Sequence, residues 1–533
     1  MASINLIGLI AFAATAVILL GSELLAAYPA SQFAGYFRLT VSGYLLVTGL
    51  SVFSIIEGRI NFLHKNITKA LSAAAILLCI TQATAALMLP GLYQTYVKGS
   101  TPSAQEKLRY AHGPFLQFPA QSPHSLDTGG VTIWWFDPSP GSKPPSVEVS
   151  YRRDMSNSRM FTEKTGMGKR RRSVAITGLS AGKTCYYRIP RFDLTARSFV
   201  FPDKNTESVR FTIIGDVSNH GNFKHSHFRE LALVTRRFYQ NQGQGPAMAL
   251  LTGDLANRGS DIASWEIFLT SARPLLNEIP AVIPLGNHET YDDRGGNRDY
   301  LLDQPRYGAF DLGPIRVIYL HNFDSFSGIN GLLDSAQYRF LERELGKAAG
   351  RRWIMVSLHV SPVSTGDFNM NKGLMKQYLP LFRKYRVDLV TGGHDHHFDA
   401  FWMDRDSAHE GTFIVINGGG GSRLDSYIMT RRKHRWKTWY HDRTAPEGLY
   451  QHDPFTKKYH VYGELSWGFC DVEVKGDSLK VTYYRWLELP RYRELTRQKS
   501  RITMHPFSRE FMDENKLWSV EPVLVLEKKR VFK

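Results

Sequence analysis

Five clusters of polar residues in the middle of the chain have the side-chain types that bind metal ions. Each cluster follows a short apolar run, and its polar members are Asp, Asn and His. These residues offer carboxylate, amide and imidazole ligands, which suit zinc, manganese or iron. In chain order the clusters are Gly215-Asp216, Gly253-Asp254, Gly286-Asn287-His288-Glu289, His359 and Gly392-Gly393-His394-Asp395-His396. The pattern predicts one metal centre assembled from separate segments.

The apolar runs before these clusters are typical of strands that are buried on both faces of a sheet. They cover residues 211–214, 247–252, 281–285, 353–358 and 387–391. Helical patterns such as 227–239 and 338–348 lie between them. Ligands of α/β sheets gather beyond the carboxyl ends of the strands, so the five clusters are expected to converge there. One such cluster alone is more often a turn or a helix cap, but five in this order favour a shared site.

This order of motifs resembles the calcineurin-like metallophosphoesterase superfamily over residues 208–486. The amino-acid sequence between the motifs is most similar to the purple acid phosphatase branch. The similar stretches are Gln337–Leu345, Arg352-Trp353, His359-Val360-Ser361-Pro362, Thr412–Asn417 with Gly418–Gly421, and the late strand pair 468–486. Residues 254–259 instead look like the second motif of protein serine/threonine phosphatases. The resemblance implies an α/β fold in which a β-sandwich is flanked by helices (α/β/β/α). It also implies that the protein hydrolyses phosphate esters.

The resemblance also implies a role for each motif residue. Asp254 would bridge two divalent or trivalent ions of iron, manganese or zinc, which would activate water for attack on phosphorus. The other ligands would be divided between the ions: Asp216 and His396 for the first, and Asn287, His359 and His394 for the second. His288 would lie beside the phosphate, as its hydrogen-bond donor or as the acid for the leaving group. Arg258 would contact the phosphate.

The first metal site departs from the family pattern. Most members have Asp-x-His in the first motif, where this chain has Asp216-Val217-Ser218. Purple acid phosphatases supply a tyrosine three residues after the bridging aspartate, but Asn257 stands there, so no purple colour is expected. The site would be completed by Ser218, Asn257, His220 or water, although an ordinary loop histidine is an equal interpretation of His220. Asn257 also replaces an aspartate that orients the catalytic histidine in serine/threonine phosphatases, so His288 needs another partner.

The first hundred residues predict a membrane anchor. Three apolar segments approach the length that crosses a bilayer, and they cover residues 6–25, 39–56 and 71–89. The first has no positively charged leader, which favours an uncleaved helix over a signal peptide. The loop after the second segment has three basic residues, against one in the loop before it. The positive-inside rule then predicts a multi-pass cell-membrane protein with its catalytic domain on the periplasmic or extracellular side.

Two further regions flank the motifs. Residues 104–208 alternate like strands, and their stretch 176–188 resembles fibronectin type III domains and, more closely, the N-terminal sandwich of purple acid phosphatases. The predicted organisation is a three-helix anchor (1–97), a fibronectin-III-like β-domain (104–208), the phosphoesterase domain (209–487) and a C-terminal extension (488–533).

Composition and net charge indicate which classes of binding partner the chain favours. The chain is 43% hydrophobic, which allows a large core, and its three cysteines have no metal-binding spacing. The net charge of +17 favours anionic partners. The basic runs 169–172 and 431–437 are interpreted as solvated loops, with anionic lipid headgroups of the bilayer as the alternative partner. Nucleic acid is a weaker interpretation because no recognised binding fold accompanies the charge.

The leading functional interpretation is hydrolysis of phosphomonoesters. Cleavage of phosphodiesters or phospholipids stays open, since the metal motifs serve that chemistry equally. A pseudoenzyme or scaffold with a degenerate first metal site is the alternative from a different class, because of Ser218 in the first motif.

Overall fold

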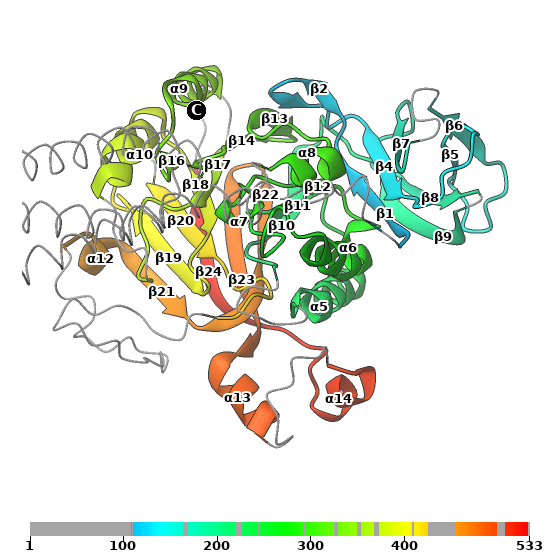
Figure 1. The fold of residues 1–533 in the computed structure, drawn as a ribbon. Coiled ribbons are helices and arrows are strands. Elements are labelled where there is room, and N and C mark those ends of the chain that lie inside the picture. Colours follow the sequence, from blue (N-terminus) through cyan, green and yellow to red (C-terminus); the bar gives the residue numbers. More distant parts are fainter. Residues whose placement is uncertain are drawn as a thin grey trace, which may run out of the picture. The chain divides into compact units, whose positions relative to one another are not determined.

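Two packed β-sheets form the centre of the computed structural model (Figure 1). The first sheet has, in spatial order, β24 (Glu521–Lys529), β23 (Ser478–Glu488), β22 (Ser466–Lys475), β10 (Ser208–Ile214), β11 (Ala249–Leu251), β12 (Ala281–Val282), β1 (His112–Gln117), β4 (Val131–Phe136) and β7 (Arg171–Ile176). The second has β2 (Ala120–Ser122), β3 (Ser125–Leu126), β13 (Gly308–Leu312), β14 (Ile315–Tyr319), β17 (Trp353–Val360), β18 (Leu389–Gly393), β20 (Thr412–Asn417), β19 (Phe398–Met403) and β21 (His460–Glu464).

The chain divides into two compact units. The first, Met1–Thr101 with Ser325–Gly328, lies outside the residues that the structure describes, and the second comprises Pro102–Asp324 and Ile329–Lys533. The described residues are 108, 110–163, 169–190, 192–218, 226–243, 245–290, 295–324, 329–348, 353–366, 372–407, 410–424, 454–497 and 507–530. All elements named below belong to the second unit.

Helices cover the outer faces of both sheets (Figure 1). Helices α5 (Phe228–Asn241) and α6 (Ile262–Leu276) pack on the first sheet, and α9 (Ser335–Ala348) and α10 (Lys372–Tyr385) pack on the second. Successive side chains of β10 point to opposite faces of the first sheet. Phe211 and Ile213 face the second sheet, and Ile214 faces the helices. The predicted α/β/β/α arrangement is confirmed.

Parallel strands bring the predicted polar clusters to one edge. Strands β10, β11 and β12 run parallel in the first sheet, and β14, β17, β18 and β20 run parallel in the second. Their interior positions are buried on both faces, as the apolar runs predicted. The chain therefore leaves the strands beside one another at the carboxyl ends, where the metal-binding side chains begin.

The region before residue 208 forms a smaller β-sandwich that continues into the first sheet. A four-stranded sheet of β6 (Arg159–Thr162), β5 (Ser146–Ser150), β8 (Thr184–Ile189) and β9 (Asp193–Val200) packs on β1, β4 and β7. Strand β1 also pairs in parallel with β12. The domain boundary near residue 208 stays a prediction.

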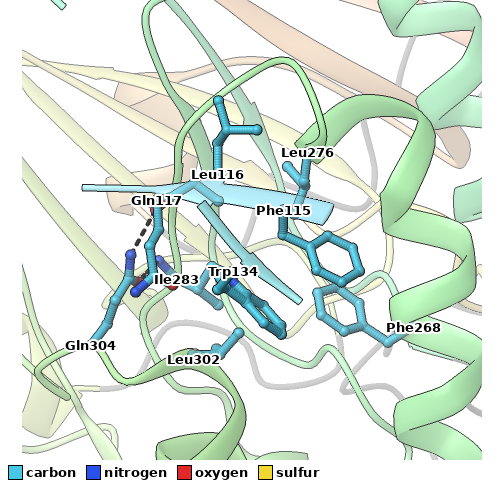
Figure 2. Close-up of a pocket in the computed structure, with 10 residues that line it drawn as sticks. Phe115, Leu116, Gln117, Trp134, Phe268, Leu276, Ile283, Leu302 and Gln304 are labelled. Carbon is cyan, nitrogen blue, oxygen red and sulfur yellow. Dashed lines mark hydrogen bonds between the residues drawn. The ribbon is translucent and has the colours of Figure 1, made fainter. Parts of the chain in front are cut away.

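Figure 2 shows the contact between the small sandwich and α6. Phe115 and Trp134 lie with ring centroids 4.6 Å apart and share a pocket with Phe268 of α6. The cavity left between them is only about 10 Å³, so the joint is close-packed. Gln304 closes its polar end by donating from Nε2 to the carbonyl of Ala281 at 2.7 Å.

Half of the first basic run is internal, which corrects its interpretation as a solvated loop. Arg171 donates from Nε to the carbonyl of Leu301 at 2.7 Å, and Arg172 is buried and donates to the carbonyl of Lys143. These guanidiniums lie in β7 and bind backbone carbonyls that face them, so they offer no free charge to lipid or nucleic acid. The second basic run, 431–437, lies outside the described residues.

No helix within the described ranges is long and apolar enough to cross a membrane. This finding contradicts the predicted three transmembrane helices, and with them the multi-pass membrane location, the outward-facing catalytic domain and the bilayer partner. The segments that suggested them, 6–25, 39–56 and 71–89, lie outside the described residues. The prediction rested on apolar length alone, a property that membrane spans share with other apolar segments. The described residues form an α/β fold.

The C-terminal region completes the first sheet. After α13 (Leu489–Arg497) and α14 (Arg509–Glu514), β24 pairs with β23 along its whole length. Lys528 on this strand is buried, with Nζ 3.1 Å from Asp388 Oδ1 and donating to the carbonyl of Gly411 at 2.7 Å. Arg530 also pairs with Asp388. Since Asp388 directly precedes β18, this ion-pair cluster joins the two sheets.

Lys528→Met is expected to lower the free energy of unfolding by about 3–5 kcal/mol, because the buried Asp388 loses one of its two cationic partners. The matched control is Lys529→Met, whose side chain is 76% exposed and should change stability by less than about 0.5 kcal/mol. Urea unfolding followed by tryptophan fluorescence measures both variants. Equal effects of the two substitutions would show that the buried ion pair contributes nothing.

Candidate metal centre

Two buried groups of side chains share one carboxylate. The first consists of Asp216, Asp254 and His396, and the second of Asp254, His359 and His394. Within each group, the ligand atoms of the three residues lie within 4.8 Å of one another. Asp254 belongs to both groups, so its two carboxylate oxygens can serve two cations at once.

The aspartates are aimed by unusual backbone conformations at the strand ends. Asp216 follows β10 with φ 56°, and Asp254 follows β11 with φ 57°, both in the left-handed region that L-residues seldom adopt. The two loops support each other, because the Asp216 amide donates to the carbonyl of Gly253 at 3.1 Å. A Cβ at Gly393 would collide with the Asp216 carboxylate, so only glycine fits there. Strain of this kind is typical of functional sites.

Two ligand atoms of the second group meet at Asn287. Its Oδ1 lies 2.9 Å from His359 Nε2 and 2.9 Å from His394 Nδ1. The other ring nitrogen of His359, Nδ1, donates to the carbonyl of Thr252 at 2.8 Å. That hydrogen bond keeps the proton on Nδ1, so Nε2 is the nitrogen that can bind a cation once the ring is neutral.

The first group is built in the same way. His396 Nε2 lies 3.5 Å from Asp216 Oδ1, and its Nδ1 donates to the carbonyl of Arg423 at 2.7 Å. Asp216 is 0% exposed, and its Oδ1 has no hydrogen-bond partner within the described part of the chain. A buried carboxylate oxygen without a donor is costly, so the residues present fit a bound cation.

Burial and mutual proximity shift the protonation of these groups. Burial raises the pKa of Asp216. Burial also opposes ionisation of Asp254, but His359 and His288 outweigh it and lower the pKa of Asp254. Burial by itself lowers the pKa of His359, and the Asp254 carboxylate overcomes this and raises it to about 10. For His394, burial and the charge of His359 lower the pKa. Asp254 is thus kept anionic, with a protonated His359 beside it.

His288 lies at the rim of the centre and is held by the loop that follows Asp254. Its Nδ1 donates to the carbonyl of Asn257 at 2.6 Å, and its Nε2 lies 3.7 Å from Asp254 Oδ2. The partner that the sequence left open for His288 is therefore the backbone of Asn257, the residue that replaces the expected aspartate. This hydrogen bond turns Nε2 toward the shared carboxylate.

Glu289 is a functional residue to which sequence reasoning gave no role. It is 0% exposed, and its carboxylate accepts hydrogen bonds from the amides of Asp254, Leu255, Ala256 and Gly286 at 2.6–3.1 Å. Both the loop of the shared aspartate and the loop of Asn287 are fixed by this one side chain. The signal available in the sequence was an acidic residue directly after His288, in a stretch otherwise buried.

The remaining predicted residues are placed as follows. The hydroxyl of Ser218 lies 3.1 Å from the hydroxyl of Ser422, with which it forms a hydrogen bond. Arg258 is exposed on the loop between Asp254 and α6, next to Gly259, whose amide donates to the carbonyl of His288 at 2.8 Å. His220 lies outside the described residues. The structure thus brings all six predicted metal ligands and His288 together, and their roles stay predictions.

Glu289→Gln is expected to weaken metal binding by about 10- to 100-fold, because one carboxylate oxygen is replaced by an NH2 group that donates hydrogen bonds and cannot accept them. The matched control is Glu342→Gln, a helix position whose carboxylate pairs with Lys384 at the surface. Calorimetric titration of the metal-free variants with Mn²⁺ measures the affinity. Unchanged binding by Glu289→Gln would show that the loops hold their positions without it.

Metal binding is expected to release protons at neutral pH. A cation needs the neutral imidazole of His359, but its pKa of about 10 keeps the ring protonated below that pH. Affinity for Mn²⁺ should therefore rise with pH by up to about tenfold per unit below pH 10, with about one proton released from His359. Titration in buffers of different ionisation enthalpy counts the protons, and His359→Gln should abolish this contribution. Proton-neutral binding by the unaltered protein would contradict the charge state assigned to His359.

Comparison with known proteins agrees with this geometry. Residues 209–398 match the family model of the calcineurin-like phosphoesterases. An uncharacterized protein of Mycobacterium tuberculosis is 30% identical over 234 residues, which cover 34% of this chain and 44% of that protein. Purple acid phosphatase 18 of Arabidopsis thaliana is 24% identical, over 47% of this chain and 58% of that protein. The chain spans about half the length of the curated relatives it matches.

Solved structures share the fold. The purple acid phosphatase from yellow lupin seeds aligns with a TM-score of 0.52 at 14% identity, over 70% of this chain and 72% of its own. PhoD aligns with a TM-score of 0.53 at 11% identity, over 78% of this chain and 90% of its own. The match over residues 209–398 and the shared fold support the predicted superfamily for this domain, and with it the class of the phosphoester hydrolases.

Proposed function

We propose that the protein hydrolyses phosphate monoesters at a dinuclear metal centre. The observation that carries the proposal is the membership of Asp254 in both buried ligand groups. Similarity to proteins named purple acid phosphatases supports the same reaction class. The retention of Asp216 and His396 in the first group supports an intact site despite the altered first motif.

Each ion would be held by a distinct set of residues. Asp216 and His396 would hold the first ion, Asn287, His359 and His394 the second, and Asp254 both. When bound, two such ions lower the pKa of a water molecule and neutralise the phosphate oxygens. The ligands are oxygen and imidazole nitrogen, a set that iron, manganese and zinc all accept. Asn257 in place of a tyrosine provides no phenolate, so the loaded protein should lack the purple charge-transfer band.

His288 is the proposed proton donor to the leaving group. Its Nδ1–H is committed to the carbonyl of Asn257, so the ring has one orientation. In the protonated form of the ring, Nε2–H faces the centre beside Asp254. Its proton can be transferred to the leaving oxygen as the P–O bond breaks. The neighbouring Arg258 is exposed on the same loop and is proposed to bind the phosphate oxygens.

Two alternatives remain as outcomes of the test. Relatives include a nucleotide pyrophosphatase/phosphodiesterase from Hordeum vulgare, 22% identical, and a probable inactive purple acid phosphatase from Arabidopsis thaliana, 25% identical. The chain could accordingly favour diesters, or bind without turnover as a scaffold. The same metal-loaded preparation distinguishes all three functions.

Asp254→Asn is expected to lose metal and turnover together, because the shared ligand is lost. His288→Ala should keep its metal and lose turnover by about a hundred- to ten-thousand-fold, since proton transfer is removed. His124→Ala, an exposed histidine on the turn between β2 and β3, serves as control. Elemental analysis and a screen of mono- and diesters with manganese, zinc or iron measure these effects.

The proposal is contradicted if Asp254→Asn retains two ions and full activity. Turnover of diesters but not monoesters would favour the phosphodiesterase. Two bound ions without turnover of either class would favour the scaffold.

A further inference from the structure

A second arginine, Arg423, lies beside the first ligand group of the metal centre. Arg423 follows the glycine-rich loop 418–421 after β20, and its carbonyl accepts the hydrogen bond from His396 Nδ1 at 2.7 Å. The other nitrogen of that ring belongs to the first ligand group. The Arg423 backbone therefore lies one imidazole ring away from the first metal site.

The segment around Arg423 is fixed from both sides. The amide of Ser422 donates to the carbonyl of Asp216 at 3.0 Å, and its hydroxyl donates to the carbonyl of Ser218 at 2.9 Å. Trp467 Nε1 donates to the carbonyl of Ser422 at 2.7 Å. On the other side, Leu424 is buried in the core beneath α5. Residues that touch the metal ligands thus hold the Cα of Arg423 in place.

The Arg423 side chain is used differently from other arginines near the core. Arg298, for example, is buried and donates to the carbonyls of Gln304 and Ile283. Arg423 is exposed, and no ion pair or hydrogen bond joins its guanidinium to another residue in the described ranges. A rigid backbone beside a metal site, with an exposed arginine that has no partner within the described ranges, is a suitable position for binding an anion.

We propose that Arg423 binds the substrate phosphate and makes the site selective for monoesters over diesters. This rests on the proposed function. A monoester has one more non-bridging oxygen than a diester and carries about two negative charges rather than one. A guanidinium donates charge-assisted hydrogen bonds to such oxygens. A diester keeps only two non-bridging oxygens, which the two ions would take, so it lacks the third oxygen and the second negative charge that Arg423 would recognise in a monoester.

The experiment compares Arg423→Ala and Arg423→Lys with Arg405→Ala in the full chain loaded with Mn²⁺. Arg405 is an exposed arginine in the turn after β19, at the end of that strand opposite the metal centre, and stacks on Trp402 at 4.3 Å. Calorimetry measures the affinity for inorganic phosphate. Steady-state kinetics give KM and kcat for para-nitrophenyl phosphate and for its bis-ester, and elemental analysis gives metal content.

Arg423→Ala should weaken phosphate binding and raise KM for the monoester by about tenfold, as expected for one charge-assisted hydrogen bond. Metal content and diester kinetics should stay as in Arg405→Ala, and Arg423→Lys should lie between. Phosphate affinity equal to that of Arg405→Ala, or equal losses for both esters, would overturn the assignment. If the unaltered protein hydrolyses neither ester, the proposed function fails, while phosphate affinity still decides the role of Arg423.

Discussion

The buried carboxylate of Asp254 is the constraint on which the rest of the site depends. Only 1% of the residue is exposed, and it lies between two groups of ligands that it shares. An ionised carboxylate at such a position requires compensating charge, because burial alone strongly disfavours it. His359 and His288 supply that charge without an ion and lower the pKa of Asp254. A pair of cations would supply it more completely, which is why the arrangement is best understood as a metal centre.

The precision of the site comes from backbone contacts more than from the ligands themselves. Asp216 and Asp254 adopt left-handed conformations that persist only if their surroundings impose them. Buried parallel strands fix one side of each loop, and the carboxylate of Glu289 fixes the loop of Asp254 on the other. His288, His359 and His396 each donate from Nδ1 to a backbone carbonyl, so the same type of hydrogen bond orients all three rings.

Sequence reasoning predicted the features that follow from the order of residues along buried strands. Polar clusters directly after apolar runs had to meet at one sheet edge, and the structure brings them together there. The partner of His288 was missed because it is a backbone carbonyl of Asn257, and a residue's identity does not reveal where its carbonyl points. Glu289 was missed for the same reason, since its partners are amides of a loop whose path depends on tertiary packing.

Predictions based on runs of charge and on the length of apolar segments were less reliable. Arg171 and Arg172 belong to a basic run that resembles a solvated loop, yet neighbouring carbonyls bind both side chains. Membrane spans were inferred from apolar length, which does not report on tertiary context. Each error concerns a property that depends on distant parts of the chain.

Electron paramagnetic resonance of the protein loaded with Mn²⁺ tests the shared carboxylate most directly. Two ions bridged by Asp254 should be magnetically coupled, and the spectrum at full loading should be that of an exchange-coupled pair. The stoichiometry should approach two ions per chain, with coupling that disappears in Asp254→Asn. A spectrum of isolated Mn²⁺ at saturation, or a limit of one ion per chain, would contradict a dinuclear centre built on Asp254.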